Sequence, residues 1–162
     1  MNLEQKQLDR CIKEETFINI FTDNYDDSYL GFLIDSNDQF LVLKKFDDKG
    51  NFDGIIIIFI ENITRIRWDG NEISSIFKLI ENSKRFSEKN IIDISSMDSV
   101  LKSLSEIYGY VNIAIQDIDS SVCFIGEITE MDDETLILNE FGTKVSLDRK
   151  MLMISKVNIT LI

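Results

Sequence analysis

The spacing of apolar residues changes from helical to alternating near the start of the chain. In residues 3–15, Leu3, Leu8 and Cys11 lie at roughly helical spacing among charged residues, a pattern that predicts a short amphipathic helix. From Phe17 onward the apolar residues follow a period of two, which is typical of β-strands, and polar turn sequences separate the runs. The expected strands cover residues 17–22, 28–35, 39–46, 54–60 and 63–68.

The rest of the chain repeats this order of elements. Residues 71–80 place their isoleucines on one helical face, which predicts a second helix. A third helix is expected to begin at Ser95 or Ser96, either of which can cap it, and to end at Gly109. Further strands are expected at residues 110–113, 122–129, 135–141, 144–148 and 150–154, with residues 157–162 closing the second half.

One stretch of the chain occurs twice. Residues 31–46 align without a gap on residues 126–141, and five of the sixteen aligned pairs are identical. Self-similarity of this kind predicts that one supersecondary unit was duplicated. Gly31 and Gly126 fall at equivalent positions within a strand, where a missing side chain suits a sharp bend.

The repeat predicts a fold that is mainly β with short helices. Five short, strongly bent strands cannot cover an open sheet, so each half is expected to curl into a small barrel that a helix precedes. We assign residues 1–82 to a first barrel with helices at both ends and residues 95–162 to a second barrel with a leading helix. The polar segment 83–94 between them is the expected linker.

The repeated segment resembles the first signature of the Sm-like family of small barrels, which belongs to the broader SH3-like architecture. That signature runs Gly, any residue, Leu, two of any residue, an apolar residue, Asp, two of any residue, an apolar residue, Asn and an apolar residue. The second copy matches at Gly126, Ile128, Met131, Asp132 and Ile137, and the first at Gly31, Leu33, Phe40 and Val42. The resemblance implies two tandem five-stranded barrels, each preceded by a helix.

The chain departs from the family at the residues that bind RNA. In RNA-binding members the Asn of the signature contacts a base, and a residue two positions earlier stacks on it. Here Leu41 and Leu136 hold the Asn position, and Gln39 and Glu134 hold the stacking position. The family's second signature, Ile-Arg-Gly, is echoed only in residues 66–70. Because binding of single-stranded RNA needs stacking faces and a cationic groove, RNA binding is not expected from this resemblance.

Charge and composition narrow the classes of partner. The 162 residues include 29 acidic and 17 basic side chains, and the net charge of −12 is spread over both halves. Such a surface repels nucleic acid and anionic lipid and attracts basic proteins. The chain has no histidine and only two cysteines, Cys11 and Cys123, which argues against a zinc site, a disulfide scaffold and a redox motif, and we expect no cofactor. The first residues lack a signal-peptide pattern, and no apolar run could span a bilayer, so we expect a cytoplasmic protein.

Catalysis and metal binding have little support in the sequence. Nucleophilic triads need a base, usually histidine, and the many carboxylates lie in turns rather than in apolar pockets. We therefore expect no enzyme, with a carboxylate-based enzyme as the minor alternative. Residues 47–53 gather oxygen ligands around a glycine, but they lack the alternating ligands of a calcium loop, and a hairpin turn explains them better.

The candidate binding residues are apolar, aromatic or acidic. Residues 55–60 show no alternation, so both faces of that strand need cover, and Ile56, Ile58 and Ile60 are predicted to form an interface strand. In Sm-like rings the equivalent strand pairs with a neighbouring barrel. The residues expected to contact a partner are Tyr25, Asp26, Asp27 and Tyr29 around an acidic loop, and Arg67 and Trp68 near a strand end.

These observations favour a cytoplasmic protein-binding or assembly module with an acidic surface. One specific form is a neutraliser of a basic toxin or nuclease, in the manner of small bacterial immunity proteins. The alternative is an Sm-like RNA-binding protein that acts as an oligomer, with a locally positive surface supplied by Lys44, Lys45, Arg65 and Arg67. We expect a monomer or a small homo-oligomer.

Overall fold

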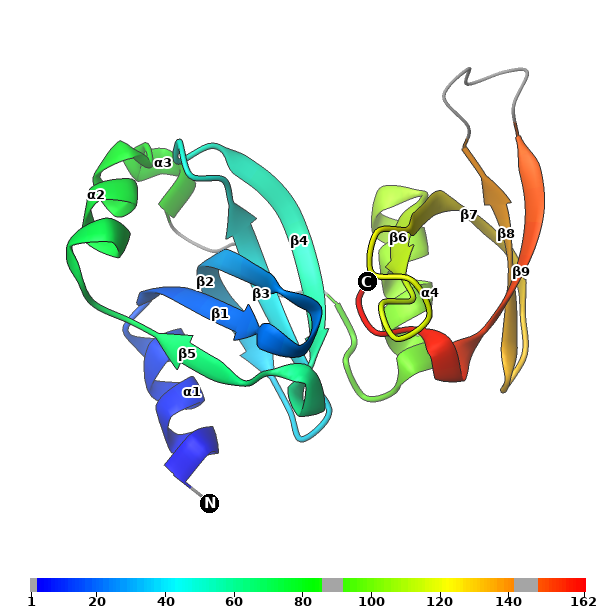
Figure 1. Cartoon of the computed structure of the whole chain (residues 1–162), viewed down its shortest axis with the longest axis horizontal. Helices are drawn as coiled ribbons and strands as arrows, with labels where there is room; N and C mark the ends of the chain where they lie inside the picture. The colour runs from blue at the N-terminus through cyan, green and yellow to red at the C-terminus, as the bar shows by residue number, and fades with distance from the viewer. Residues whose placement is uncertain (1–2, 86–91, 142–148) are drawn as a thin grey trace. The chain divides into compact units, whose positions relative to one another are not determined.

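The computed structural model describes residues 3–85, 92–141 and 149–162 of the chain (Figure 1). The chain divides into two compact units, Met1–Asn90 and Ile91–Ile162. This division falls inside the predicted linker 83–94, although the beginning of that segment belongs to a short helix, α3 (Asn82–Arg85). None of the helices in the described ranges has the length and apolar character needed to cross a membrane.

The first unit is a five-stranded antiparallel sheet with helices at both ends of its sequence. The strands are arranged in the order β4-β3-β2-β1-β5. Because β1 pairs with β5, the last strand in sequence returns to lie beside the first (Figure 1). The elements are α1 (Leu3–Lys13), β1 (Phe17–Thr22), η1 (Asp23–Tyr25), β2 (Asp27–Ser36), β3 (Phe40–Phe46), β4 (Phe52–Phe59), η2 (Ile60–Asn62), β5 (Arg65–Arg67) and α2 (Asn71–Leu79).

Both faces of the first sheet bury apolar side chains. Ile18 and Ile20 of β1 are fully buried, and we call the face of the sheet that carries them the inner face. The opposite, outer face carries Phe17, which lies 5.1 Å from Phe32 between ring centroids. Helix α2 covers this outer face, because its apolar stripe packs on a cluster of three phenylalanines. The buried members of the cluster are Phe17, Phe32, Phe46, Ile73, Ile76 and Ile80.

The second unit begins with a helix whose ends follow the sequence signals. Helix α4 (Met97–Tyr108) begins after Ser96, whose Oγ accepts a hydrogen bond from the Ser99 backbone N–H at 3.1 Å. It ends at Gly109, which adopts a left-handed φ of 78°. Four antiparallel strands follow in the order β6-β7-β8-β9. They are β6 (Val111–Ala114), β7 (Cys123–Met131), β8 (Thr135–Glu140) and β9 (Lys150–Ser155).

The predicted closing segment, residues 157–162, forms no named strand of the second unit. Residues 156–158 form a short 3-10 helix, η3 (Lys156–Asn158), and only an isolated bridge joins Ala114 to Leu161. The predicted strand at 144–148 lies outside the described residues. Within the described part of the chain the strand pairing closes neither sheet into a barrel, because β4 and β5 lie at the edges of the first sheet and β6 and β9 at those of the second.

The two aligned segments share local geometry. The pairing of β2 with β3 shifts register after Leu33, and the pairing of β7 with β8 shifts after Ile128, so each second strand carries a bulge at the same place. Gly31 and Gly126 each lie two residues before the residue at which the bulge begins. A Cβ added at Gly31 would overlap the backbone of β3, and one at Gly126 would overlap the backbone of β8. Close approach of the neighbouring strand therefore explains both glycines.

Candidate functional site

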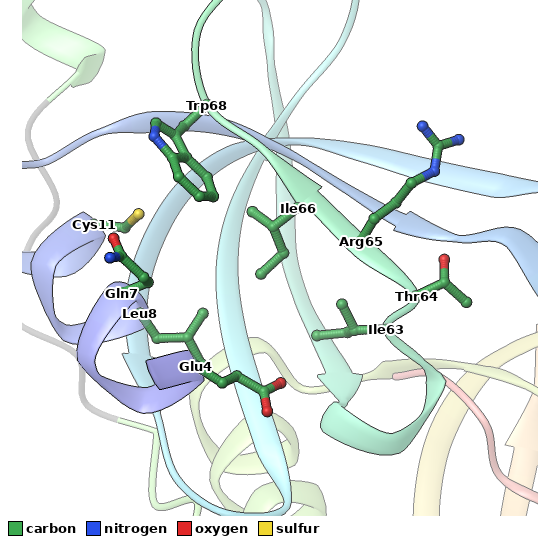
Figure 2. A pocket seen from close by; sticks show the side chains of 9 residues that line it. All are labelled: Glu4, Gln7, Leu8, Cys11, Ile63, Thr64, Arg65, Ile66 and Trp68. Carbon is green, nitrogen blue, oxygen red and sulfur yellow. The ribbon is translucent and has the colours of Figure 1, made fainter. Parts of the chain in front are cut away.

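A pocket of about 400 Å³ lies between α1 and the segment that forms β5. We call it the α1–β5 pocket. Its α1 side consists of Glu4, Gln7, Leu8 and Cys11, and its β5 side of Ile63, Thr64, Arg65, Ile66 and Trp68. Figure 2 shows Trp68, Ile66 and Ile63 directed toward α1, whereas the Arg65 guanidinium points away from the helix.

Alternation along a short strand gives the pocket its apolar floor. Ile66 pairs with Ile20 and lies on the inner face, whereas its neighbours Arg65 and Arg67 lie on the outer face. Opposite this strand, Leu8 and Cys11 of α1 are buried, which is what the helical spacing of the two residues predicts. The pocket is therefore apolar in its depth and polar only at its rim.

Trp68 is the most exposed apolar side chain of the pocket, with 47% of its surface accessible. The same residue lines a second hollow, of about 530 Å³, together with Phe17 and with Ile73 and Phe77 of α2. The indole therefore borders two hollows and also adjoins the helix that follows it. An exposed tryptophan between two concave surfaces is a favourable contact point for an apolar group of a partner.

The acidic loop is fixed against the start of β5 by an ion pair. Arg65 donates from Nε to Asp23 Oδ2 at 2.9 Å and from Nη2 to Asp23 Oδ1 at 2.8 Å. The Thr64 hydroxyl also donates to the Asp23 carboxylate, and the Arg65 guanidinium lies 3.6 Å from the centroid of the Phe21 ring. Hydrogen bonds from Arg65 and Thr64 lower the pKa of Asp23 to about 2, so the carboxylate is ionised at neutral pH.

The structure brings some of the predicted partner-binding residues to this site and leaves one buried. Tyr25 is half-buried, and its hydroxyl lies 3.5 Å from Asn62 Oδ1, which places the acidic loop next to the residues that lead into β5. Asp26 is exposed and has a left-handed φ of 58°. Tyr29 is buried and donates its hydroxyl to the half-buried Asp27 at 3.2 Å, so its ring contributes little accessible surface.

The other predicted binding residues lie at the edges of the first sheet. Arg67 is exposed on β5, and its guanidinium forms an ion pair with Glu72 of α2 at 2.9 Å. Ile56 and Ile58 are buried on β4, and Ile60 is half-buried in η2. On β4 it is therefore the backbone edge, rather than these isoleucine side chains, that is open for pairing among the described strands.

Sequence reasoning missed the α1 side of the pocket and the role of Asp23. The apolar face of the first helix was readable from Leu8 and Cys11, but no signal in the sequence says which strand that face meets. Asp23 and Arg65 are 42 residues apart, and single charges of opposite sign do not identify one another over such a separation.

The displaced pKa values among the aspartates of the described residues all shift in one direction. The aspartates whose pKa is displaced all have a lowered pKa, whereas a general acid at neutral pH needs a raised one. In the predicted loop at 47–53, the Asp47 carboxylate accepts the backbone N–H groups of Lys49 and Asn51. That carboxylate caps a hairpin turn, and no group of three or more metal-binding side chains is found within the described ranges.

Comparison with known proteins adds no assignment to this geometry. No family model, no curated protein and no solved structure matches the chain.

Proposed function

We propose that this chain is a non-catalytic protein-binding module that holds a segment of a basic partner protein at the α1–β5 pocket. The observation that carries the proposal is the position of Trp68, which is half-exposed at the wall of an apolar pocket beside an open strand edge. The apolar pocket with Trp68 at its wall and the open strand edge each support a different part of this interaction, and the negative charge around the pocket supports a third.

The pocket provides the apolar contact. Its volume lies at the lower end of the range of ligand pockets, roughly 300–1,000 Å³. Ile66 and Leu8 form its depth, and Trp68 stands at its border. A large aliphatic or aromatic side chain of a partner would be desolvated here, which is how hot-spot residues contribute most of their binding energy.

The strand edge provides main-chain hydrogen bonds. Among the described strands, β5 pairs only with β1, so the other edge of Arg65–Arg67 is open. An extended segment that adds to such an edge gains backbone hydrogen bonds, and alternate side chains reach pockets on the sheet face. The side chain that faces the same way as Ile66 would enter the α1–β5 pocket.

Negative charge around the pocket provides the preference for a basic partner. Glu4 stands at the rim, and the loop with Asp26 and Asp27 is fixed next to β5 by the Asp23–Arg65 pair. With an overall net charge of −12, the chain would attract a basic protein rapidly, and salt would slow the association. Neutralisation of a basic toxin or nuclease, as by an immunity protein, is the specific form of this function that we favour.

We also propose that both units are copies of one Sm-like barrel unit. In each unit a helix precedes antiparallel strands, a glycine lies opposite the backbone of the next strand, and a bulge follows. A further parallel supports the common origin. The Thr64 hydroxyl accepts the Asp23 backbone N–H at 3.2 Å, and the Thr160 hydroxyl accepts that of Gln116 at 2.9 Å.

The alternative is an Sm-like RNA-binding protein that acts as an oligomer. Three of the four cations that would supply its positive surface are engaged with carboxylates: Lys45 with Asp53, Arg65 with Asp23 and Arg67 with Glu72. RNA phosphates would have to compete with these pairs. The protein-binding proposal therefore has the better support.

A pull-down with matched variants tests the proposal. The bait is the full chain, as wild type, as Trp68→Ala and as Phe52→Ala, and the extract is cytoplasmic, with and without nuclease. Phe52 on β4 is as exposed as Trp68 but does not line the pocket, which makes it the control. We expect a basic protein that resists nuclease, elutes with salt and is lost on Trp68→Ala but not on Phe52→Ala.

A titration with the purified partner makes the test quantitative. Trp68 is the only tryptophan of the chain, so its fluorescence reports occupancy of the pocket directly, provided that the partner's own tryptophans are subtracted. Equal binding by Trp68→Ala and wild type would refute the role of the pocket. Recovery of nucleic acid that nuclease removes would favour the RNA-binding alternative.

A further inference from the structure

The outer face of the second sheet carries apolar side chains that no described helix covers. We define the β7–β9 face by Tyr110, Ile125, Phe141, Met151 and Met153, which alternation places on one side of the sheet. In the first unit α2 covers the corresponding face. Helix α4, the one α-helix among the described residues of the second unit, contacts β6 and borders a hollow with residues 128–131 of β7.

The two outer faces correspond in detail. In the first unit Phe17 and Phe46 lie 6.2 Å apart between ring centroids, and α2 packs on both. In the second unit the ring centroids of Tyr110 and Phe141 also lie 6.2 Å apart, with an angle of 51° between the ring planes where the first pair has 74°. The strand that lies between the two aromatic residues is paired in the same way in both units. In the first unit Leu30 of β2 lies opposite Phe46. In the second unit the Phe141 backbone N–H donates to the carbonyl oxygen of Ile125 in β7 at 2.7 Å.

The exposure of the two faces differs sharply. Phe17 and Phe46 are 6% and 1% exposed, whereas Tyr110 is 51% exposed and Ile125 is 39% exposed. Met151 and Met153 are more exposed still, on the neighbouring β9. Several exposed apolar side chains on one face mark an interaction site, and methionine adapts its shape to a partner.

The charges on the β7–β9 face indicate which kind of helix it would accept. Glu127 and Glu130 project from β7 on the same side as Ile125 and Ile137, and Glu130 is exposed. Arg149 lies 3.5 Å from Glu127 and 4.8 Å from the centroid of the Phe141 ring, so it occupies one border of the aromatic pair. Glu127 is already paired with Arg149, so a basic residue beside the apolar stripe of a helix would complement Glu130 and compete with Arg149 for Glu127.

We propose that the β7–β9 face docks a basic amphipathic helix of a partner protein, in the way that α2 docks on the first sheet. The apolar stripe of that helix carries large aliphatic or aromatic residues at the spacing of Ile73, Ile76 and Ile80. The stripe packs on the Tyr110–Phe141 pair, and its flanking lysines or arginines approach the glutamates of β7. This site lies in the second unit and is independent of the α1–β5 pocket.

The first probe is a peptide built on α2. It spans residues 70–81 with Glu72→Lys and Glu81→Lys, blocked ends and a fluorescent label, and its anisotropy is followed as the full chain is added. The matched control peptide carries Ile73→Asp and Ile76→Asp in addition. We expect saturable binding of the first peptide and none of the control.

Variants of the full chain locate the binding surface. Ile125→Lys and Met153→Lys place a positive charge on the β7–β9 face, which interrupts its apolar surface and repels a basic helix, and each should weaken binding by roughly tenfold or more. Val157→Lys is the matched control, because Val157 is 87% exposed and lies in η3 rather than on this face. Circular dichroism and unfolding curves identify any variant that fails to fold, and Met153→Lys is the safer of the two because Met153 is the more exposed.

Four results would overturn the proposal. Three concern the peptides: equal binding of both peptides, binding that Ile125→Lys and Met153→Lys leave unchanged, and no saturable binding at all. The fourth is a dimer in sedimentation that Met153→Lys dissociates, because the face would then hold a second copy of the chain.

Discussion

Asp23 and Arg65 form a two-point ion pair that joins the acidic loop to the edge strand β5, with N–O distances of 2.8 and 2.9 Å. The pair is solvent-exposed, so it contributes little to the free energy of unfolding and serves mainly to position the acidic loop. It holds the loop beside the α1–β5 pocket, and Thr64 reinforces it from the adjacent position.

The Asp23–Arg65 pair makes the stability of the first unit depend on pH. The pKa of Asp23 is lowered from 3.8 to about 2, so its contribution is present above pH 3.8 and is lost as the pH falls through about 2. We expect Asp23→Asn to lower the urea midpoint at neutral pH and to differ less from wild type near pH 2. Asp38→Asn, which changes an exposed carboxylate in the β2–β3 turn, is the control. A difference that persists at low pH would contradict this origin.

Gly31 and Gly126 should each tolerate no side chain. An alanine Cβ at Gly31 would stand 2.9 Å from the Lys44 carbonyl carbon, and at Gly126 2.9 Å from that of Asn139, with the carbonyl oxygens closer still. We expect Gly31→Ala and Gly126→Ala to cost about 1–3 kcal/mol each in the free energy of unfolding, as overpacking does. Urea unfolding, followed by NMR separately for each unit, measures this loss of stability. The control Ser28→Ala, on the exposed part of β2, should change the free energy of unfolding little.

The buried Lys156 predicts an order of effects in the second unit. Its ammonium group donates to Asp98 at the start of α4 and to the backbone carbonyl of Asp132, and the side chain is 7% exposed. Asp98→Ala leaves a buried charge with one partner fewer, which costs about 1–3 kcal/mol or more. Lys156→Met removes that charge and leaves Asp98 near solvent, so we expect a smaller loss. Thermal unfolding of both variants shows which one loses more stability. A larger loss for Lys156→Met than for Asp98→Ala would show that the Lys156 charge does not destabilise the fold when Asp98 is absent.

The two thiols should differ in reactivity. Cys11 is buried on the apolar face of α1, and burial raises the pKa of its thiol, which reduces the thiolate available at neutral pH. Cys123 is exposed at the start of β7. We expect a maleimide to label one thiol per chain quickly, as counted by mass spectrometry, and the second only in denaturant. Cys123→Ser should abolish the fast labelling. Rapid modification of Cys11 in that variant would show that α1 separates readily from β5.

The sequence predicts local structure well because a period of two or 3.6 is visible in one strand or one helix. Strands β2 and β3 agree with their predicted ranges within one residue, and Ser96 and Gly109 bound α4 as expected. The closing segment 157–162 is predicted without an element type, and the structure places the η3 turn at its start. A stretch of six residues with mixed polarity carries too few periods to predict whether it forms a strand or a turn.

The candidate site was harder to predict because it is built from distant segments. Trp68 stood out as the single tryptophan, but its place between two hollows depends on α1 and α2 at once. Tyr29 was expected at an exposed rim and is buried, since strand alternation turns it to the same face as Gly31 and Leu33. Patterns along the chain specify which face a residue occupies, and packing specifies what that face meets.

The return of β5 to β1 has a consequence for synthesis on the ribosome. Asn19 of β1 pairs with Arg67, so the first strand waits for that residue to leave the exit tunnel before it gains its second neighbour. No strand pair of the first unit needs a residue of the second unit, because the first sheet uses residues 17–67 alone. The sheet of the amino-terminal unit can therefore form while the rest of the chain is still being translated.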